Sequence, residues 1–506
     1  MKTAVVIFIL IAIGKLTALG KDMSMSAIFG ISWQADAYFI ASGVPLLIFS
    51  AVYATIPIVF LPLYTKIKLQ QNQSTAFGFS NNFLSIFLLL SLLLCVMSIY
   101  FAPNIIDLIS QKLPNEVRLL SINLARIFSL SFVLTIFIGV FSSIQYANKS
   151  LIGPQLIPII NNIIVMSAII FLSRSYGIEV VAYSAVFAWL VQIPLQKKLT
   201  TSEYIFKFNF SIKGVNINHF FILFIPAFFG ILIDQVNILV DLYLSSGLKI
   251  GTVSAISYSS KLTMLVGLTL PIVVTTIMYP YYSDSAVKGM TRTLSLLVEK
   301  SIKISLMLTV PILIISILFN DDIIKLLFQR GEFNDKATIY TSEIFLYYAF
   351  AIVFIGIREV FSKVFFALQK PNIILYISTI SVAINIILSI TLVQHIGVVG
   401  IPLATSISVL VHIILQCVML SKILGSRFYR KLDKFLIKIS IASAGLIFAF
   451  FLFDWLVFSG EEMIMGLLAY FILLIIFYIA ILYTLNLKEV RVFVNLCLRF
   501  IFNRRF

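Results

Sequence analysis

Residues 76–102 read AFGFSNNFLSIFLLLSLLLCVMSIYFA and contain no charged side chain. About 20 apolar residues are enough for a helix to cross the hydrocarbon core of a bilayer. The whole 506-residue chain has the same character, since 60% of it is hydrophobic, only 11% is charged and the mean hydropathy is +1.07. Soluble domains carry about 25% charged residues. The composition therefore excludes a set of soluble domains and predicts a polytopic membrane protein.

Fourteen apolar runs are long enough to span a membrane, which predicts an all-α membrane protein with fourteen transmembrane helices. The predicted spans cover roughly residues 4–31, 36–64, 76–102, 117–146, 152–173, 179–196, 218–244, 251–281, 296–320, 340–366, 373–393, 399–421, 435–455 and 463–486. The connections between them are too short for a folded domain outside the membrane. We expect no cleaved leader, because Lys15 interrupts the first apolar run.

The charge balance predicts the orientation of the chain. There are 37 Lys and Arg residues against 21 Asp and Glu, a net charge of +16. With the N-terminus inside, 25 of the 37 fall in cytoplasmic connections and helix ends and 7 in outer loops. Cytoplasmic loops carry the excess of Lys and Arg in membrane proteins. Both termini are therefore predicted to be cytoplasmic, with a basic tail at 488–506 along the inner surface, and the positive charge needs no nucleic-acid partner.

Several chemistries are excluded by what the sequence lacks. The cysteines Cys95, Cys417 and Cys497 lie in apolar runs with unrelated spacing, so they form neither a disulfide framework nor a metal cluster. A GxxxxGK phosphate loop does not occur, which argues against ATP-driven transport by this chain alone. Nor do the residues suggest a nucleophile paired with a general base, and we expect a transporter rather than an enzyme.

The chain also repeats itself. The stretch from Gly177 to Gln196 matches the stretch from Gly397 to Gln416 in spacing, 220 residues further on. Both copies enter the membrane in the same direction, which favours parallel repeats about an axis along the membrane normal. We therefore predict a six-helix lobe at 1–217, a second at 218–434, and two appended helices with the tail at 435–506.

Ionisable residues inside spans are candidates for function, because each costs about 2.5–3.5 kcal/mol on insertion scales. Lys15, Lys21 and Lys261 are predicted to meet an anionic substrate, with Asp36 beside them. A structural reading competes with this one. Asp22 follows Lys15 by seven residues and can pair with it, and Asp36 stands at the start of the second span, where a carboxylate caps a helix.

Oxygen-bearing side chains in the second half suggest a cation site. Asp234 lies in the middle of the seventh span, Asn385 in the eleventh and Thr405 in the twelfth. Carboxylate, amide and hydroxyl oxygens suit a hard cation such as Na⁺. The alternative is a cluster of hydrogen bonds between helices, worth roughly 0.6 kcal/mol per bond.

Several motifs resemble the MurJ (MviN) family. Gly20-Lys21-Asp22 and the 35–41 stretch ADAYFIA look like its opening, and QRGEF at 329–333 is similar to a second signature. The turn ALQKP at 367–371 is similar to the sequence of that family as well. The resemblance covers the first twelve spans and implies the fold of the multidrug/oligosaccharidyl-lipid/polysaccharide (MOP) exporters, which is MATE-like and has a V-shaped central cavity.

The resemblance also implies a function. Members of the family move lipid II, the undecaprenyl-pyrophosphate-linked peptidoglycan precursor, to the outer leaflet of the bacterial cytoplasmic membrane. The family's cavity arginines match Lys15, Lys21 and Lys261, and its aspartate matches Asp36. Its sodium site maps to three residues, Asp234, Asn385 and Thr405. Na⁺ or H⁺ is implied as the coupling ion, membrane lipid and the lipid-linked saccharide as partners, and cell-wall synthesis proteins as further candidates.

Departures from the family pattern leave other cargoes open. Lysine replaces arginine at all three cavity positions and lacks the planar fork that grips phosphate at two points. A related lipid-linked saccharide, such as an exopolysaccharide or O-antigen unit, is one alternative. A cation-coupled drug antiporter is another, although it would favour acids over lysines in the cavity, and a non-transporting scaffold for envelope synthesis is the third.

Overall fold

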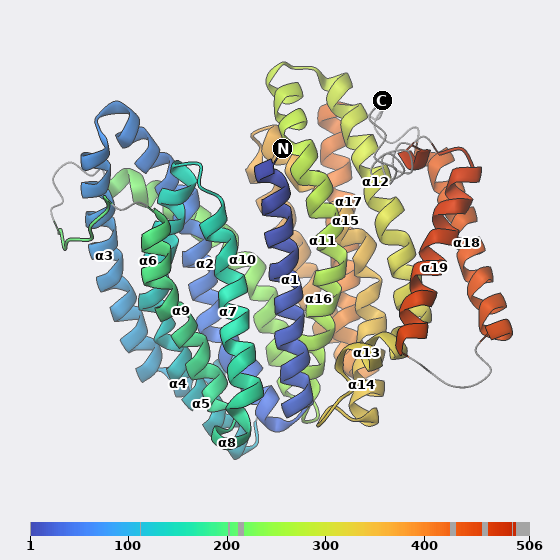
Figure 1. The fold of residues 1–506 in the computed structure, drawn as a ribbon, viewed down its shortest axis with the longest axis horizontal. Coiled ribbons are helices and arrows are strands. Elements are labelled where there is room, and N and C mark those ends of the chain that lie inside the picture. The colour runs from blue at the N-terminus through green and yellow to red at the C-terminus, as the bar shows by residue number, and fades with distance from the viewer. Residues whose placement is uncertain are drawn as a thin grey trace. The chain divides into compact units, whose positions relative to one another are not determined.

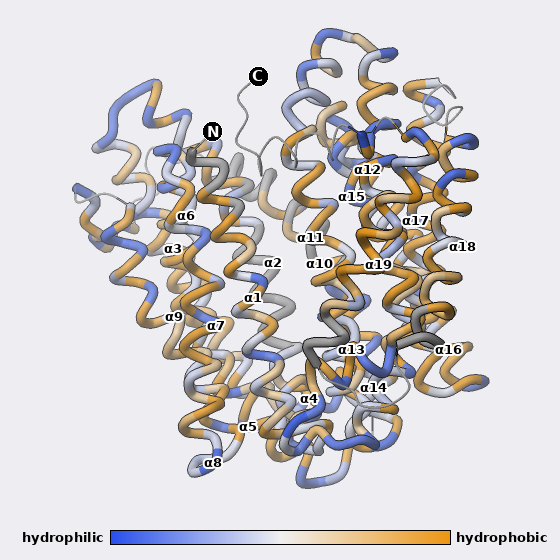
Figure 2. The backbone as a smooth tube through the Cα atoms, turned by 45° about the vertical axis from the view of Figure 1, so that its right-hand side comes forward, coloured by the Kyte–Doolittle hydropathy of each residue, from blue (hydrophilic) through white to orange (hydrophobic). Residues whose placement is uncertain are grey.

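The computed structural model describes residues 2–111, 113–200, 203–210, 217–425, 432–457, 464–487 and 489–491. Within these ranges the chain forms α-helices and one 3-10 turn, and no strand occurs there. Figure 2 shows hydrophobic residues along the helices and hydrophilic ones gathered at the turns. The all-α membrane fold is therefore confirmed.

Each of the fourteen predicted spans coincides with one helix or with two consecutive helices. In the described part of the chain, eight helical stretches meet the length and hydropathy needed to cross a membrane, or nine with the bent stretch at Asp335–Ala367. These findings are consistent with fourteen crossings, and the full count stays a prediction.

The helices belong to two compact units. The first unit comprises Met1–Tyr258, Leu327–Tyr340 and Leu388–Ile401, and the second comprises Ser259–Leu326, Thr341–Ile387 and Pro402–Phe506. Helices wholly in the first are α1 (Lys2–Phe29), α2 (Trp33–Gln70), α3 (Gln73–Tyr100), α4 (Ala102–Ile109), α5 (Asn115–Ser129), α6 (Ser131–Ala147), α7 (Ile152–Phe171), α8 (Ser173–Tyr176), α9 (Glu179–Thr200) and α10 (Ile217–Ser246).

Helices wholly in the second unit are α12 (Thr291–Leu318), α15 (Ala351–Ala367), α18 (Leu432–Val457) and α19 (Ile464–Thr484). The helices shared between the units are α11 (Thr252–Val287), α13 (Asn320–Phe328), α14 (Asp335–Ala349), α16 (Pro371–Ile396) and α17 (Gly400–Leu424). The 3-10 turn η1 (Gly397–Val399) belongs to the first unit. Figure 1 labels the α-helices. This division into two units does not test the lobe boundaries predicted at residues 217 and 434, which stay a prediction.

Polar caps and close helix contacts explain how the first unit is built. The Ser32 hydroxyl accepts a hydrogen bond from the Ala35 amide at 3.3 Å and begins α2, and the Asn72 side chain does the same for α3 at 2.8 Å. Such caps satisfy amides that have no partner within their own helix. Helix α1 packs along α7, as Figure 1 shows, and the backbone of Gly14 lies against Pro158 there.

An aromatic cluster fills the interior between α2 and α3. Phe60 stacks on Phe79 with ring centroids 5.3 Å apart, and Phe83 stacks on Phe87 at 4.3 Å. All four rings are buried. Phenylalanine buries a large apolar area, and offset aromatic pairs add about 0.5–1.5 kcal/mol each.

In the second unit, α12 carries the appended helices α18 and α19. The Phe319 ring meets Phe450 and Tyr470 edge-on, with centroids 4.9 and 5.3 Å apart. Near the middle of α12, the Lys303 ammonium lies 2.6 Å from the Glu299 carboxylate and 3.8 Å from that of Glu489, which follows α19. One partly buried lysine thus ties α12 to the chain beyond α19.

The repeat predicted from the sequence extends through the helices. Helices α5 and α6 have the same lengths as α14 and α15 and begin 220 residues before them. The same offset joins Lys149 to Gln369, with φ of +58° and +56°, and Gly177 to Gly397, both with φ of +67°. We call α1 to α9 the first half and α10 to α17 the second half. Their helices correspond in order.

Two features differ from the predicted spans. The span predicted at 117–146 is broken near Leu130, and the span predicted at 340–366 is broken near Phe350. The break near Phe350 bends the helix by 40°. The amphipathic helices α4 and α13 lie in connections that were expected to be loops. A search for runs of about 20 apolar residues misses both features, because it registers length and hydropathy but not turns or short amphipathic helices.

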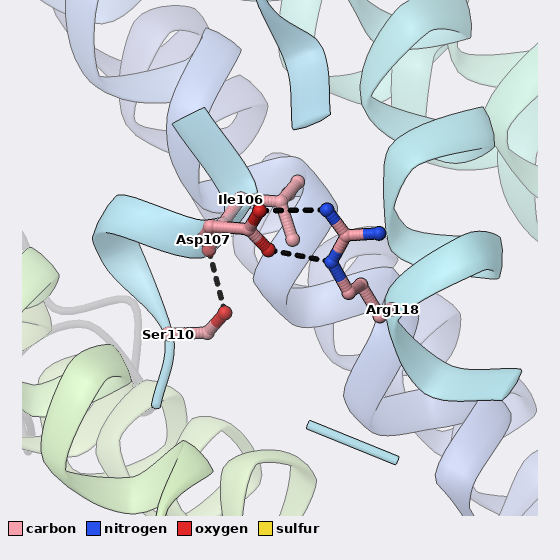
Figure 3. A network of polar contacts seen from close by, with 4 residues as sticks. All are labelled: Ile106, Asp107, Ser110 and Arg118. Carbon is pink, nitrogen blue, oxygen red and sulfur yellow. Dashed lines mark hydrogen bonds and ion pairs between the residues drawn. The ribbon is translucent and has the colours of Figure 1, made fainter. Parts of the chain in front are cut away.

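Helix α4 is held to α5 by an ion pair in one of these connections. The Arg118 guanidinium donates from Nε and Nη2 to the two Asp107 oxygens, each at 2.6 Å, and Figure 3 shows this two-point contact. The Ser110 hydroxyl donates to the Ile106 carbonyl and ends the helix. The hydrogen bonds from Arg118, and then its charge, lower the pKa of the Asp107 carboxyl below its usual value.

Candidate functional site

Helix α1 places both predicted lysines in the first unit. It runs without a break through Lys15 and Lys21, whose side chains are half-buried. The two glycines that precede them, Gly14 and Gly20, lie against Ile159 and Met166 of α7. Because these glycines serve the contact with α7 within a continuous helix, the lysines stand about 240° apart around α1.

Lys15 is not neutralised by the partner that the sequence offered. Lys15 and Asp22 form no ion pair, and among the residues that the structure describes no other acid pairs with Lys15. Reading them as a structural pair is therefore wrong. A half-buried ammonium group in an apolar helix gains most from an anion that arrives with a ligand.

Asp36 holds the beginning of α11 rather than its own helix. Its carboxylate accepts hydrogen bonds from the amide of Gly251 at 2.6 Å, from the amide of Ser254 at 2.8 Å and from the Ser254 hydroxyl at 2.7 Å. Asp36 is 5% exposed. The cap of α2 is Ser32, so the reading of Asp36 as the cap of its own helix is wrong. A negative group at the positive end of α11 is favourable.

The QRGEF signature at 329–333 lies against the end of α1. The Glu332 amide donates to the Ala27 carbonyl at 2.9 Å. At Gly331, which has φ of +60°, an added Cβ would come within 2.1 Å of that same carbonyl oxygen. Only glycine permits this approach and this φ without strain. Two motifs that are far apart in the sequence thus form one corner of the first unit.

The ring of Tyr258 closes the same corner. It packs against Phe39 of α2, with centroids 5.4 Å apart, and against Phe328 and Phe333 at 5.3 and 6.0 Å. Its hydroxyl donates to the Gly30 carbonyl at 3.3 Å. Asp36, α11 and the signature loop are therefore parts of one packed structure. Whether Asp36 also binds substrate stays a prediction.

Lys261 lies on the part of α11 that belongs to the second unit, and its side chain is exposed. Lys15 and Lys21 belong to the first unit. Its predicted role with them stays a prediction.

Two of the three predicted cation ligands are in contact. The Asn385 amide donates to the Thr405 hydroxyl at 3.2 Å and to the Ser408 hydroxyl at 3.3 Å, and all three residues are buried in the second unit. This contact fits the predicted ion site and the alternative hydrogen-bond cluster equally. The side chain of Asp234, the third residue, lies outside the described residues, although its backbone is in α10.

Helix α10 carries a further acid, Asp241, beside the predicted ligand Asp234. Asp241 and Asn237 are four residues apart, so they share one face of the helix. The Oδ1 atoms of both are buried and find no hydrogen-bond partner among the described residues. Periodicity was the available signal, because Asp234, Asn237 and Asp241 recur at three and four residues. Of the two whose side chains the structure describes, Asp241 is the one that carries a carboxylate.

Known proteins resemble this chain along most of its length. The family model described as lipid II flippase MurJ matches residues 25–483. The chain belongs to the MurJ family. Its relatives include the probable lipid II flippase MurJ of Thermotoga maritima, 26% identical over 85% of this chain and 86% of that protein. The lipid II flippase MurJ of Thermosipho africanus is 26% identical over 92% and 94%.

Solved structures agree on the fold. The lipid II flippase MurJ in an inward closed conformation superposes with a TM-score of 0.81 over 98% of this chain and 100% of that one, at 24% identity. A multidrug resistance MATE transporter of the MOP superfamily, in an inward-facing conformation, gives 0.68 over 82% and 94%, at 14% identity. The predicted MATE-like fold is therefore confirmed.

Proposed function

We propose that this MurJ family member moves lipid II from the inner to the outer leaflet of the bacterial cytoplasmic membrane. The match to the MurJ family model over residues 25–483 supports this proposal. It is also supported by two relatives named as lipid II flippase or probable lipid II flippase, which this chain matches over 94% and 86% of their length. One observation in the structure carries the proposal. Lys15 is half-buried in a membrane helix, and no acid among the described residues neutralises it.

The cargo explains such lysines. Lipid II carries a diphosphate that must leave water and pass roughly 30 Å of hydrocarbon while its polyprenyl tail stays in lipid. Lys15 and Lys21 bind this diphosphate, and Lys261 supplies a third positive charge. An inside-negative potential helps a negative headgroup outward by about 2.3 kcal/mol per charge per 100 mV. Because Asp36 binds α11, it acts on the structure of the corner at Gly30 and Gly331.

A coupling cation resets the carrier in this proposal. Asn385 and Thr405 offer amide and hydroxyl oxygens, and Asp234 or Asp241 offers the carboxylate. Na⁺ or H⁺ moving inward returns the empty protein to its starting state. The unpartnered Asp241 oxygen supports this assignment, because a buried carboxylate without a partner gains from binding a cation or a proton.

The rest of the proposal concerns setting and partners. The chain crosses the membrane many times with both termini in the cytoplasm, as its Lys and Arg distribution favours. It carries out no covalent chemistry and is a transporter, not an enzyme. Its partners are the undecaprenyl-pyrophosphate-linked saccharide and the surrounding lipid, and cell-wall synthesis proteins are further candidates.

One assay tests the cargo. In cells depleted of their own flippase, an impermeant reagent measures how much lipid II reaches the outer leaflet when this chain is expressed. We expect lipid II to become accessible, and an unchanged inner-leaflet pool with normal expression would contradict the proposal.

Lysine in place of arginine favours a second cargo class, a lipid-linked exopolysaccharide or O-antigen unit, because a point charge demands less of the phosphate geometry. Running the same assay with such a saccharide distinguishes the two. Drug efflux from vesicles without lipid flipping would instead indicate the drug antiporter.

A further inference from the structure

The seam between α6 and α9 is buried but polar. Five residues line it and none of them ionises: Ser142, Gln145, Gln192, Gln196 and Thr200. Ser142 is 2% exposed, the three glutamines are 0% exposed and Thr200 is 6% exposed. Burying a polar group without a hydrogen bond costs about 1–3 kcal/mol in proteins, so each polar atom here needs a partner.

Part of the seam is satisfied by the protein itself. The Gln145 amide donates to Gln196 Oε1 at 2.9 Å, and the Gln196 amide donates to the Gly153 carbonyl at 3.0 Å. The Thr200 hydroxyl donates to the Gln196 carbonyl at 2.8 Å. These bonds fix how α6 and α9 lie along each other.

Four polar atoms of the seam take no part in these hydrogen bonds. Ser142 Oγ, Gln145 Oε1 and both amide atoms of Gln192 are buried and have no partner among the described residues. Because α7 runs back between them, α6 and α9 point the same way. Ser142 precedes Gln145 by one turn and Gln192 precedes Gln196 by one turn, so Ser142 and Gln192 lie at the same level of the seam, next to the Gln145–Gln196 hydrogen bond. Gln145 Oε1 lies beside Gly153 of α7.

The chemistry of these atoms identifies the ligand. They comprise a hydroxyl, two carbonyl oxygens and an amide nitrogen, which together both donate and accept. Buried water forms two to four hydrogen bonds with such mixed groups. A bare cation would meet an N–H donor and no carboxylate among the five residues, and a buried charge without a counter-charge is costly.

We propose that ordered water binds in the α6–α9 seam between Ser142, Gln145 and Gln192. The second half keeps only part of the arrangement. Gln416 corresponds to Gln196 and donates to Ser362 at 3.0 Å, where Ser362 corresponds to Ser142. His412 takes the place of Gln192, and its buried Nε2 has no partner in the described residues, but Phe365 stands at the position of Gln145. The proposed water site therefore belongs to the first half.

Substitution of Gln192 tests the site through the sign of its effect. The full-length protein in lipid nanodiscs is compared with Gln192→Leu, which keeps the size and removes both amide atoms. With water bound, Gln192→Leu strands Ser142 and Gln145, and we expect the midpoint temperature of unfolding to fall by roughly 2–4 °C. In a dry seam the same change removes two stranded atoms, so a rise would overturn the proposal. Ile193→Leu, one residue away, is the matched control.

Two further measurements keep the test independent of that variant's folding. A high-resolution map of the unaltered protein should show density within hydrogen-bonding distance of Gln192, and an empty seam would overturn the proposal. Any difference between the thermal midpoints in sodium, potassium and choline chloride should be the same in the unaltered protein and in Gln192→Leu, because a cation bound elsewhere stabilises both. A shift specific to one metal ion that Gln192→Leu abolishes would identify a cation in place of water.

Discussion

Helices α3 and α12 occupy equivalent places in the two halves, yet they are held by different side chains. On α3, Phe79 and Phe83 lie in the aromatic cluster between α2 and α3. On α12 the corresponding residues are Glu299 and Lys303, which form a buried ion pair at 2.6 Å. Only the second half carries appended helices, and Lys303 is the residue that reaches them through Glu489.

Helices α1 and α10 differ in the same manner. Lys15 and Lys21 of α1 correspond to Gln235 and Asp241 of α10. The second of these positions holds a cation in one half and an acid in the other, and the first holds a cation and a neutral amide. In the proposed function these are the sites of the anionic cargo and of the coupling cation.

The comparison separates what the repeat conserves from what it changes. The lengths of α5 and α6, two turns with positive φ and the glutamine at Gln196 and Gln416 recur at an offset of 220 residues. Most charged side chains, including Lys15, Lys21 and Asp36, do not recur. The shared features build the scaffold, since apolar length and turn geometry set the backbone. The charged residues that differ mark where one half does something that the other does not.

Breaking the Lys303 bridge should give the largest effect on stability. Lys303→Met leaves Glu299 buried without its partner, which costs roughly 3–5 kcal/mol. We expect lower thermal stability and faster proteolysis after α17, because α18 and α19 lose their polar tie to α12. Limited proteolysis of the protein in nanodiscs measures this.

Its matched control is Lys288→Met, since Lys288 pairs with Asp284 at 2.8 Å in an exposed position. The control should change little. Equal proteolysis of the two variants would contradict the role of Lys303 as the tie to α18 and α19.

Removing the Asp36 carboxylate should come second. Asp36→Ala leaves the amides of Gly251 and Ser254 without an acceptor, at a cost of roughly 2–3 kcal/mol, while the Ser254 hydroxyl can still donate to the Gly251 carbonyl. We expect faster amide hydrogen exchange at Gly251 and Ser254. Ile256 stands at the equivalent position of the second half, and its side chain cannot accept a hydrogen bond.

Two variants sharpen this test. Ser32→Ala should speed exchange at the start of α2 and leave Gly251 unchanged. Protection at Ser254 that survives Asp36→Ala would show that α11 is capped by another group.

The repeated glycines should respond equally. Gly177 and Gly397 share a φ of +67°, and an added Cβ at either would meet no atom within 4 Å. Each change to alanine therefore costs only the strain of a positive φ, roughly 1–3 kcal/mol. Thermal unfolding of both variants measures it, and a marked difference between them would show that the two halves are not equivalent at this turn.

The smallest effect concerns pH. The Asp107–Arg118 pair belongs to the first half alone, since Leu327 and Thr338 stand at the equivalent positions. The pKa of Asp107 is lowered in the folded protein, so its contribution is complete above the unfolded value of about 3.9 and is lost as the pH falls through the lower folded value. Thermal scans between about pH 5 and pH 3 should lose a small pH-dependent component in Asp107→Asn. An unchanged profile would contradict the pair's contribution.

Sequence alone predicted the helices well and the site in part. Apolar length identified all fourteen helical stretches, because burial in lipid demands it. The repeat was visible at Gly177 and Gly397, since a left-handed turn favours glycine. Asp36 was misread, because its partners lie 215 and 218 residues further along the chain. No local pattern reports such a contact, and the absence of a Lys15–Asp22 pair likewise depends on side-chain placement.

Binding of the diphosphate tests the central claim most directly. Native mass spectrometry of the purified protein, unaltered and as Lys21→Ala and Lys21→Arg, would measure affinity for undecaprenyl pyrophosphate and for undecaprenol, which lacks phosphate. Each lost charged contact is worth about 1.5–3 kcal/mol, so Lys21→Ala should weaken diphosphate binding by roughly tenfold or more. Lys21→Arg should bind at least as well as lysine, and undecaprenol should bind all three proteins alike. Equal diphosphate affinity in Lys21→Ala would contradict the assignment of α1 as the site that receives the cargo.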